Sequence, residues 1–380
     1  MVNKIVLSPV LFFILFWSVI ISVGGIDRFE FYPFSDAFYL YMLTVFCVFS
    51  VSAYLGGVSS NSFYANKTVE TLKFTFKHKN HLQIYLFFMS LGIAVMCWQH
   101  YKVVGIFFWT PTEINHFRYL VTEGGVSVSS GVLSFFNFFF YTMIPLLATV
   151  NKRDRNKYKK IFILLLLIYI YLSSARASMF VISLIGFFYY TILNKQAGLG
   201  KLVLLFFLLI FAFVLLGTLT GKGHFDSIWR YAFGPIHALD RIIVNGAPAG
   251  SPDLYLFRPL HSLFLKLDLL SPSSSRLLPY VSTPYTINVY TVFGPYIMDF
   301  GLYGSLVCVS FWAFISGFII KLGKKLVSPF TSLLAALCLS LIILGVFYDY
   351  YLSSAFPWII VILGSIFFPK RYDASMLHRI

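Results

Sequence analysis

Residues 160–195 read KIFILLLLIYIYLSSARASMFVISLIGFFYYTILNK, and this stretch decides the fold class. It consists of two apolar runs with a lysine at each end and a single charged residue, Arg176, between them. A helix that crosses a hydrocarbon layer about 30 Å thick needs about 20 apolar residues, because it rises about 1.5 Å per residue. The stretch therefore predicts a hairpin of two membrane helices with Arg176 at its turn.

The composition of the whole chain also indicates a protein that lies in the lipid bilayer. Of its 380 residues 59% are hydrophobic and 11% are charged, whereas soluble domains average about 45–50% and 25%. This excludes a water-soluble globule, and it makes nucleic-acid binding a poor explanation of the net charge of +15. The four cysteines lie in apolar runs, so neither a disulfide framework nor a cysteine zinc site is expected.

Ten apolar runs satisfy the length criterion for a spanning helix, and we therefore predict an all-α polytopic membrane protein. In this division residues 1–220 hold spans one to seven, residues 221–300 form a large outer loop with short amphipathic helices, and residues 301–380 hold spans eight to ten. The runs are 5–24, 38–57, 82–104, 132–150, 161–175, 177–194, 202–220, 301–320, 329–348 and 354–369.

The basic residues predict the orientation, because short cytoplasmic loops are enriched in Lys and Arg. With both termini inside, 19 of the 29 basic residues but only three of the 14 acidic ones lie in the cytoplasm. Inside, 15 of the 19 are Lys, whereas seven of the ten outer ones are Arg. Since Arg binds phosphate bidentately, this excess suggests a function on the outer side, although pairing with outer carboxylates would also explain it.

Arg176 is the most specific of the outer arginines. It lies 16 residues after Lys160 and 19 before Lys195, which correspond to helix lengths of about 24 and 28 Å. Because neither arm quite spans the layer, we expect Arg176 at or slightly below the outer hydrocarbon boundary, where an unpaired guanidinium is costly. Its partner would be an outer Asp or the phosphate of a lipid-linked ligand.

The outer loop contains two predicted helices. Asp226 is a suitable cap for a helix that runs to Asn245 and ends at Gly246, and on it Arg230, His237 and Arg241 share one face. Gly234 and Pro235 could kink or split this helix.

The second predicted helix runs from Pro259 to Leu270 and has Arg258 and His261 at its front end, where backbone N–H groups favour anions. An amphipathic helix lying in the membrane interface would have the same pattern.

After these helices comes 284-PYTINVYTVFGPYIMDFGLYG-304. Tyr285, Tyr290 and Tyr296 offer flat aromatic surface and Asn288 an amide, which together suit sugar rings, while Asp299 precedes the eighth run. An interfacial aromatic belt would explain the tyrosines alone. It would not explain Asn288, or an Asp so close to two glycines.

Three motifs carry a resemblance to a known family: SARAS at 174–178, AFGPIHALD at 232–240, and NVYTVFGPY at 288–296 followed by DFGLYG at 299–304. With them the chain resembles the bacterial O-antigen (Wzy-type) polymerases, which join oligosaccharide repeat units. The resemblance implies a GT-C-like membrane fold and a glycosyltransferase of the bacterial inner membrane with a periplasmic active site. Its substrate would be an undecaprenyl-pyrophosphate-linked oligosaccharide, and a chain-length regulator protein would be a partner.

A pyrophosphate leaving group needs stabilisation of its negative charge, and no metal-ligand cluster is evident, so we expect guanidinium groups as donors, with no metal and no cofactor. The predicted pyrophosphate-binding residues are Arg176, Arg230, Arg241 and Arg258. The predicted sugar-binding residues are Tyr285, Asn288, Tyr290 and Tyr296. The candidates for a catalytic base are Asp299, ranked first, Asp240 and His261, with His237 as a further titratable group.

Two other functions remain open on sequence grounds. An O-antigen ligase would transfer the glycan to a lipid A core instead of another repeat unit. A transporter or flippase for lipid-linked oligosaccharides would share size, hydropathy and basic inner loops. A flippase should carry ionisable groups within its spans, and here the middles of the ten runs contain none.

Overall fold

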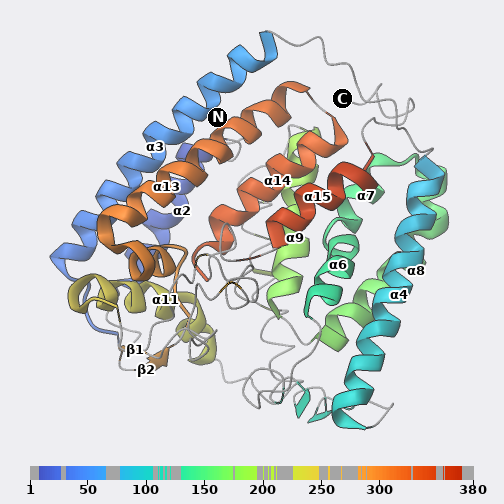
Figure 1. Ribbon diagram of the computed structural model, residues 1–380, viewed down its shortest axis with the longest axis horizontal. Helices are drawn as coiled ribbons and strands as arrows, with labels where there is room; N and C mark the ends of the chain where they lie inside the picture. Colours follow the sequence, from blue (N-terminus) through green and yellow to red (C-terminus); the bar gives the residue numbers. More distant parts are fainter. Residues whose placement is uncertain are drawn as a thin grey trace. The chain divides into compact units, whose positions relative to one another are not determined.

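The computed structural model describes residues 8–26, 31–65, 78–105, 130–173, 176–194, 226–247, 281–283, 285–287, 289–326, 328–347 and 356–369, with scattered single positions between them. Eleven helices and one two-stranded sheet make up these ranges (Figure 1). The helices are α2 (Pro9–Gly24), α3 (Asp36–Ala65), α4 (His78–Val104), α6 (Ser130–Tyr141), α7 (Met143–Thr149), α8 (Lys152–Ser173), α9 (Arg176–Asn194), α11 (Asp226–Asn245), α13 (Phe293–Leu326), α14 (Pro329–Leu344) and α15 (Phe356–Phe367).

Within the described ranges, three helices are long and apolar enough to cross a membrane: Asp36–Asn61, Asn80–Val104 and Phe293–Lys325. Four further apolar helices are shorter, and helices lie at nine of the ten predicted runs. The tenth run, 202–220, lies mostly outside the described residues. The architecture is therefore that of a nearly all-helical protein with membrane-spanning character, while ten crossing helices and a GT-C-like fold stay predictions.

The chain divides into two compact units. Unit 1 consists of residues 1–68, 225–322 and 338–357, and unit 2 of residues 69–224, 323–337 and 358–380. Each unit thus joins segments that are far apart in sequence. The predicted division of the chain into membrane and loop segments is a separate prediction that these units do not test.

In unit 1, α3 and α13 run side by side in the same direction (Figure 1). Their backbones meet at two glycines, since a Cβ on Gly56 would overlap the carbonyl of Phe314 and one on Gly317 would overlap that of Ala53. The hydroxyl groups of Ser52 and Ser310 lie 2.8 Å apart in the same interface. Small residues at a crossing allow such close approach, which is how helices pack in lipid, where no hydrophobic force drives them together.

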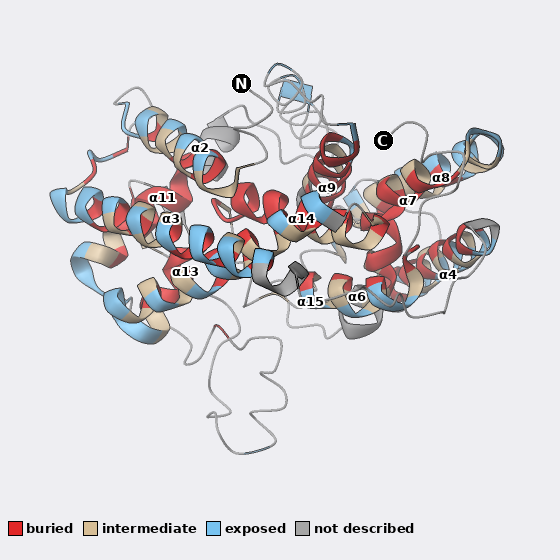
Figure 2. Ribbon diagram, turned by 90° about the horizontal axis from the view of Figure 1, so that it is seen from above, coloured by how far each residue is buried: buried red, intermediate tan, exposed pale blue. Residues whose placement is uncertain are grey.

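The opposite side of α3 exposes large apolar side chains. Leu40 is 67% exposed, Val51 60% and Tyr54 69%, and Figure 2 shows exposed and buried residues alternating along this helix. A soluble protein rarely exposes so many large apolar groups in one row, so this face fits contact with lipid.

The aromatic side chains of α2 fill the space beside α3 and α13. Phe13 stacks on Phe49 with ring centroids 3.9 Å apart, and its ring also meets that of Trp312 at 5.9 Å. At the far end of α2, Gly24 lies against Phe233 of α11. The end of α2 and the start of α3 therefore lie at the end of unit 1 that carries α11.

Helix α13 begins eight residues before the predicted run and is broken at Gly301. This residue has φ 70° and ψ −177°, a conformation open essentially only to glycine. A Cβ on Gly304 would overlap that of Phe300, so the second glycine of the DFGLYG motif leaves room for the chain at the break. The backbone conformation therefore explains Gly301, and the close approach of Phe300 explains Gly304. Asp299 lies two residues before the break.

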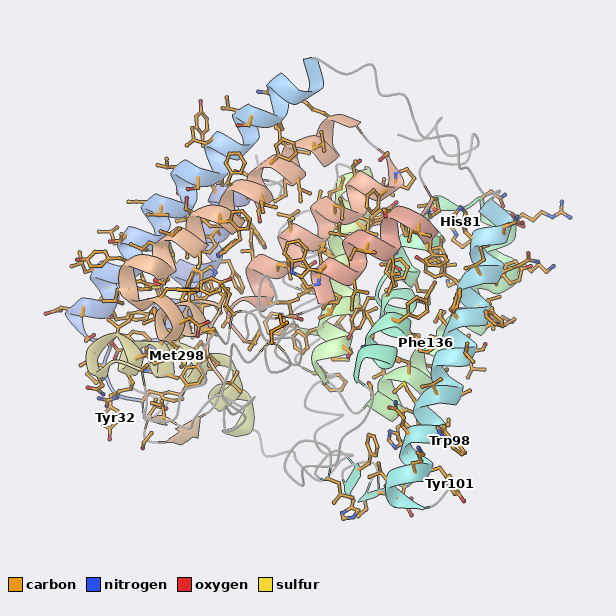
Figure 3. All side chains as sticks on the ribbon, in the orientation of Figure 1. Tyr32, His81, Trp98, Tyr101, Phe136 and Met298 are labelled. Carbon is orange, nitrogen blue, oxygen red and sulfur yellow. The ribbon has the colours of Figure 1, made fainter. Side chains whose placement is uncertain are left out.

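In unit 2, α4 packs along α6 and α8. The hydroxyl groups of Tyr85 and Thr142 lie 2.8 Å apart, and His81 Nδ1 lies 2.8 Å from the carbonyl oxygen of Phe367. Figure 3 shows His81 at one end of α4 and Tyr101 at the other. The predicted single run 132–150 is divided at Thr142 into α6 and α7, which fits Pro145, because proline has no N–H to donate to the preceding turn.

The segment 221–300, predicted as an outer loop with short helices, differs from the prediction in a second way besides the early start of α13. Besides helix it contains an antiparallel hairpin, β1 (Val281–Thr283) and β2 (Tyr285–Ile287), in which Val281 pairs with Ile287. Both strands pack on α11. The predicted end of α11 is confirmed, since its last residue is Asn245 and the following Gly246 has φ 81°. The helix continues through Pro235 without splitting.

Candidate functional site

One face of α11 carries three polar residues a turn apart, His237, Asp240 and Arg241, and all three contact the segment 31–35 that leads into α3. The sequence predicted that His237 and Arg241 share a face, and the structure confirms it. Segment 31–35 of the same chain covers that face. The polar face of α11 therefore fixes the segment that precedes α3.

His237 is stacked between two phenylalanines. Its ring lies 4.3 Å from that of Phe31 and 4.4 Å from that of Phe34, and its Nε2 lies 3.0 Å from the carbonyl oxygen of Gly24. Burial lowers the pKa of His237 to about 4, and the carbonyl of Gly24 and the charge of Asp240 offset only part of that shift. A buried, neutral imidazole that bonds the end of α2 is a structural group in this arrangement.

Asp240 holds Ser35, the residue before the first turn of α3. Its Oδ1 accepts hydrogen bonds from the Ser35 hydroxyl at 2.5 Å and from the Ser35 N–H at 3.3 Å. The Ser35 hydroxyl oxygen in turn accepts from the N–H of Phe38 at 3.1 Å, as a helix N-cap does. Asp240 is 6% exposed, so the carboxylate is committed to capping α3.

Arg241 lies half-buried at the same end of unit 1, with its guanidinium carbon 4.5 Å from the centre of the Tyr32 ring. Tyr32 is 51% exposed, and Figure 3 shows it beside α11 and the hairpin. Among the described residues no carboxylate forms an ion pair with Arg241. A stacked guanidinium that retains its N–H donors can bind an anion.

Asp299 lies in the same unit, half-buried in the first turns of α13. Its Oδ2 accepts a hydrogen bond of 2.6 Å from the backbone N–H of Leu256, a residue of the outer loop. The break at Gly301 follows two residues later. Asp299 therefore joins the loop to the point where α13 changes direction.

Tyr290 and Tyr296 are buried, with 1% and 0% of their surface exposed. Burial raises the pKa of the Tyr290 phenol well above its usual range. A Cβ on Gly294 would lie 2.7 Å from that of Tyr290, so the chain turns closely around this ring. Neither ring presents a flat face to solvent in this conformation.

Arg176, the first-ranked arginine, begins α9 in unit 2, as the predicted hairpin requires. Its side chain lies outside the described part of the structure, as do those of Arg230 and Tyr285. Arg258, His261 and Asn288, and most of the predicted helix 259–270, lie outside the described residues altogether.

A cluster of buried polar side chains that sequence reasoning missed lies below the start of α9. Tyr169 of α8 donates to Asn137 Oδ1 of α6 at 2.8 Å, and the hydroxyl groups of Tyr141 and Ser178 lie 3.0 Å apart. The residues of this cluster are neutral, so they do not appear among the ionisable groups of the apolar runs. A polar residue repeated at the same depth on neighbouring runs would have been the signal.

Within the described ranges, no three His, Cys, Asp or Glu side chains are grouped so that they could hold a metal ion. Comparison of the chain with protein-family models, with curated proteins and with solved structures found no match.

Proposed function

We propose that this chain is an O-antigen polymerase of the bacterial inner membrane, a glycosyltransferase that joins undecaprenyl-pyrophosphate-linked repeat units on the periplasmic side. The bond between the donor glycan's anomeric carbon and its pyrophosphate oxygen breaks, and the electron pair leaves with the pyrophosphate. A hydroxyl oxygen of the incoming unit forms the new bond to that carbon and gives its proton to a base. A chain-length regulator would bind the same protein in the membrane.

The observation that carries the proposal is the state of Arg241. It is half-exposed, stacked on Tyr32, and without an ion pair among the described residues, at the end of unit 1 where α2 ends and α3 begins. A guanidinium near the end of α2 and the start of α3 would, in the predicted topology, be available to a lipid-linked pyrophosphate, whose charge it could stabilise. Arg176, Arg230 and Arg258 are the further proposed donors.

The base is proposed to be Asp299. The bonds of Asp240 to Ser35 give it a capping role. His237 is buried against Phe31 and Phe34 with its pKa lowered to about 4, which makes it a weak proton acceptor. Asp299 lies two residues before the break at Gly301 and is half-buried, and its carboxylate is the proposed acceptor for the proton of the incoming hydroxyl group. His261 remains the alternative base.

The lipopolysaccharide of a strain that lacks the chain tests the function. Loss of the ladder with one repeat unit retained identifies a polymerase, whereas loss of every repeat would indicate a ligase or a flippase. In the complemented strain, Arg176→Lys and Arg241→Lys keep the charge but lose the bidentate fork, so we expect little polymer at normal protein levels.

Two further results would contradict the mechanism. If Asp299→Asn supported a full-length ladder, Asp299 would not be the base. If a chelator abolished polymer formation by the purified chain, the charge of the leaving group would be stabilised by a metal and not by arginine.

A further inference from the structure

We propose that the buried hydroxyl cluster of unit 2 positions Arg176, and that Tyr169, Tyr141 and Ser178 are therefore positioning residues for the proposed reaction. The catalytic meaning of this inference rests on the proposed function. The structural part, that these hydroxyl groups fix the start of α9, does not.

The cluster joins three helices at one depth. Tyr169 comes from α8, Tyr141 and Asn137 from α6, and Ser178 from α9. Besides its 2.8 Å bond to Asn137, the Tyr169 hydroxyl lies 3.4 Å from that of Tyr141 and 3.5 Å from that of Ser178. Tyr169 and Tyr141 are 2% and 8% exposed, so water does not compete for these bonds.

An aromatic contact also fixes the cluster. The ring of Phe140 stacks on that of Tyr169 with centroids 4.0 Å apart and planes 12° apart. The Tyr169 hydroxyl therefore has little freedom to rotate toward other partners. Loss of its oxygen would leave Asn137 Oδ1 without this donor in an apolar interior.

The other arm of the hairpin is held separately. His100 of α4, 2% exposed, is hydrogen-bonded to the backbone of Leu172, one residue before α8 ends, and its ring stacks on that of Phe117 at 3.8 Å. The end of α8 and the start of α9 are thus each fixed by a buried polar contact. Arg176 lies between these two fixed points.

Ser178 is two residues after Arg176, which is a distance of about 3 Å along the helix axis. Because both residues belong to the same turn of α9, a displacement of Ser178 also displaces the backbone of Arg176. A group that stabilises a leaving pyrophosphate has to be held to within about 0.5 Å of its working position. Hydroxyl bonds among three helices supply such a constraint without placing a charge in the membrane.

The test measures the accessibility of residue 176, which changes when its position changes. In a chain whose four native cysteines are replaced by serine, Arg176→Cys is studied alone and combined with Tyr169→Phe, with Ser178→Ala, or with Tyr190→Phe as control, which gives four proteins. Tyr190 lies on α9 and is 50% exposed, so the control loses a hydroxyl group outside the cluster. The rate at which a charged maleimide alkylates the introduced thiol is measured on the purified protein in detergent.

We expect Tyr169→Phe and Ser178→Ala each to change the alkylation rate by about threefold or more, and Tyr190→Phe to leave it unchanged. Equal rates in all four proteins would overturn the inference. So would failure of both cluster variants to accumulate, because the hydroxyl groups would then support folding as a whole and not the position of one residue.

A second readout separates this inference from the proposed function. With Arg176 intact, Tyr169→Phe should lower polymer formation about tenfold or more, and Tyr190→Phe should not. If Arg176→Lys alone kept full polymer formation, the proposed role of Arg176 would fail, while a changed alkylation rate would still establish that the cluster sets its position.

Discussion

His237, Asp240 and Arg241 lie within one turn of α11, and each meets a residue of segment 31–35. Their spacing could be read from the sequence, and so the shared face of His237 and Arg241 was predicted correctly. The identity of the covering segment could not be predicted, because it lies about 200 positions away and no local pattern connects the two. The burial of Tyr290 and Tyr296 was likewise not indicated by the local sequence, in which both tyrosines fit an exposed aromatic belt.

The capping role of Asp240 predicts a clear difference between two substitutions. Asp240→Asn retains an oxygen that can accept from Ser35, so we expect its unfolding free energy to lie within about 1 kcal/mol of the wild type. Asp240→Ala leaves the Ser35 N–H unsatisfied and should cost about 1–3 kcal/mol. Thermal unfolding of the purified variants in detergent measures both. A stable Asp240→Asn protein that forms no polymer would instead identify Asp240 as the base.

The burial of His237 predicts a pH dependence of stability. Its folded pKa of about 4 lies below the usual 6.5, so the unfolded chain takes up the proton first. The contribution of the neutral imidazole is complete above pH 6.5 and is lost as the pH falls toward 4, by on the order of 3 kcal/mol.

Unfolding midpoints of wild type and His237→Gln between about pH 7 and pH 4 measure this contribution. The Gln side chain can still donate to Gly24 but does not titrate, so the fall should be smaller in that variant. His116→Gln is the control, since His116 is exposed. An identical fall in all three proteins would show that other groups cause it.

At the scale of elements, the prediction of helices depended on local signals and succeeded where these were strong. Gly246 indicated the end of α11, whose last residue is Asn245. The signals were misleading where a feature required a special backbone conformation or a neighbour. The break at Gly301 lies inside a helix that starts earlier than hydropathy indicated, and the hairpin 281–287 is formed by strands of three residues each.

The crossing of α3 and α13 provides a matched pair of glycines. Gly56→Ala would place a methyl group on the carbonyl of Phe314, whereas the nearest atom to a methyl group on Gly57 is the Gly317 oxygen at 3.9 Å, an ordinary contact. We expect Gly56→Ala to lower the unfolding free energy by about 1–3 kcal/mol and Gly57→Ala to have little effect. Thermal unfolding in detergent distinguishes them. Equal effects would mean that helix propensity, and not this contact, sets the outcome.

At the scale of the whole molecule, the charge distribution predicts which ends of the helices face the cytoplasm. The parallel course of α3 and α13 fits the predicted order of the spans, because the second and eighth of ten spans run in the same direction whichever side faces the cytoplasm. The orientation itself stays a prediction that rests on the basic residues.

Thiol labelling tests this orientation. In a cysteine-free chain, Lys157→Cys near the start of α8 should react with an impermeant maleimide only after spheroplasts are permeabilised. Ala247→Cys, just after α11, should react in intact spheroplasts, and both positions are exposed. The reverse pattern would place the outer loop in the cytoplasm and remove the basis for a periplasmic reaction.

The contact between Gly317 and Ala53 also has a consequence for how the protein is made. The two residues are 264 positions apart, so at about 5–20 residues per second α3 waits for roughly 13 to 50 s before its partner leaves the ribosome. During that interval the face of α3 around Ala53 and Gly56 lacks the helix against which it packs in the complete protein. Completion of unit 1 is therefore a late event of biogenesis, and a chain truncated before α13 would never form this contact.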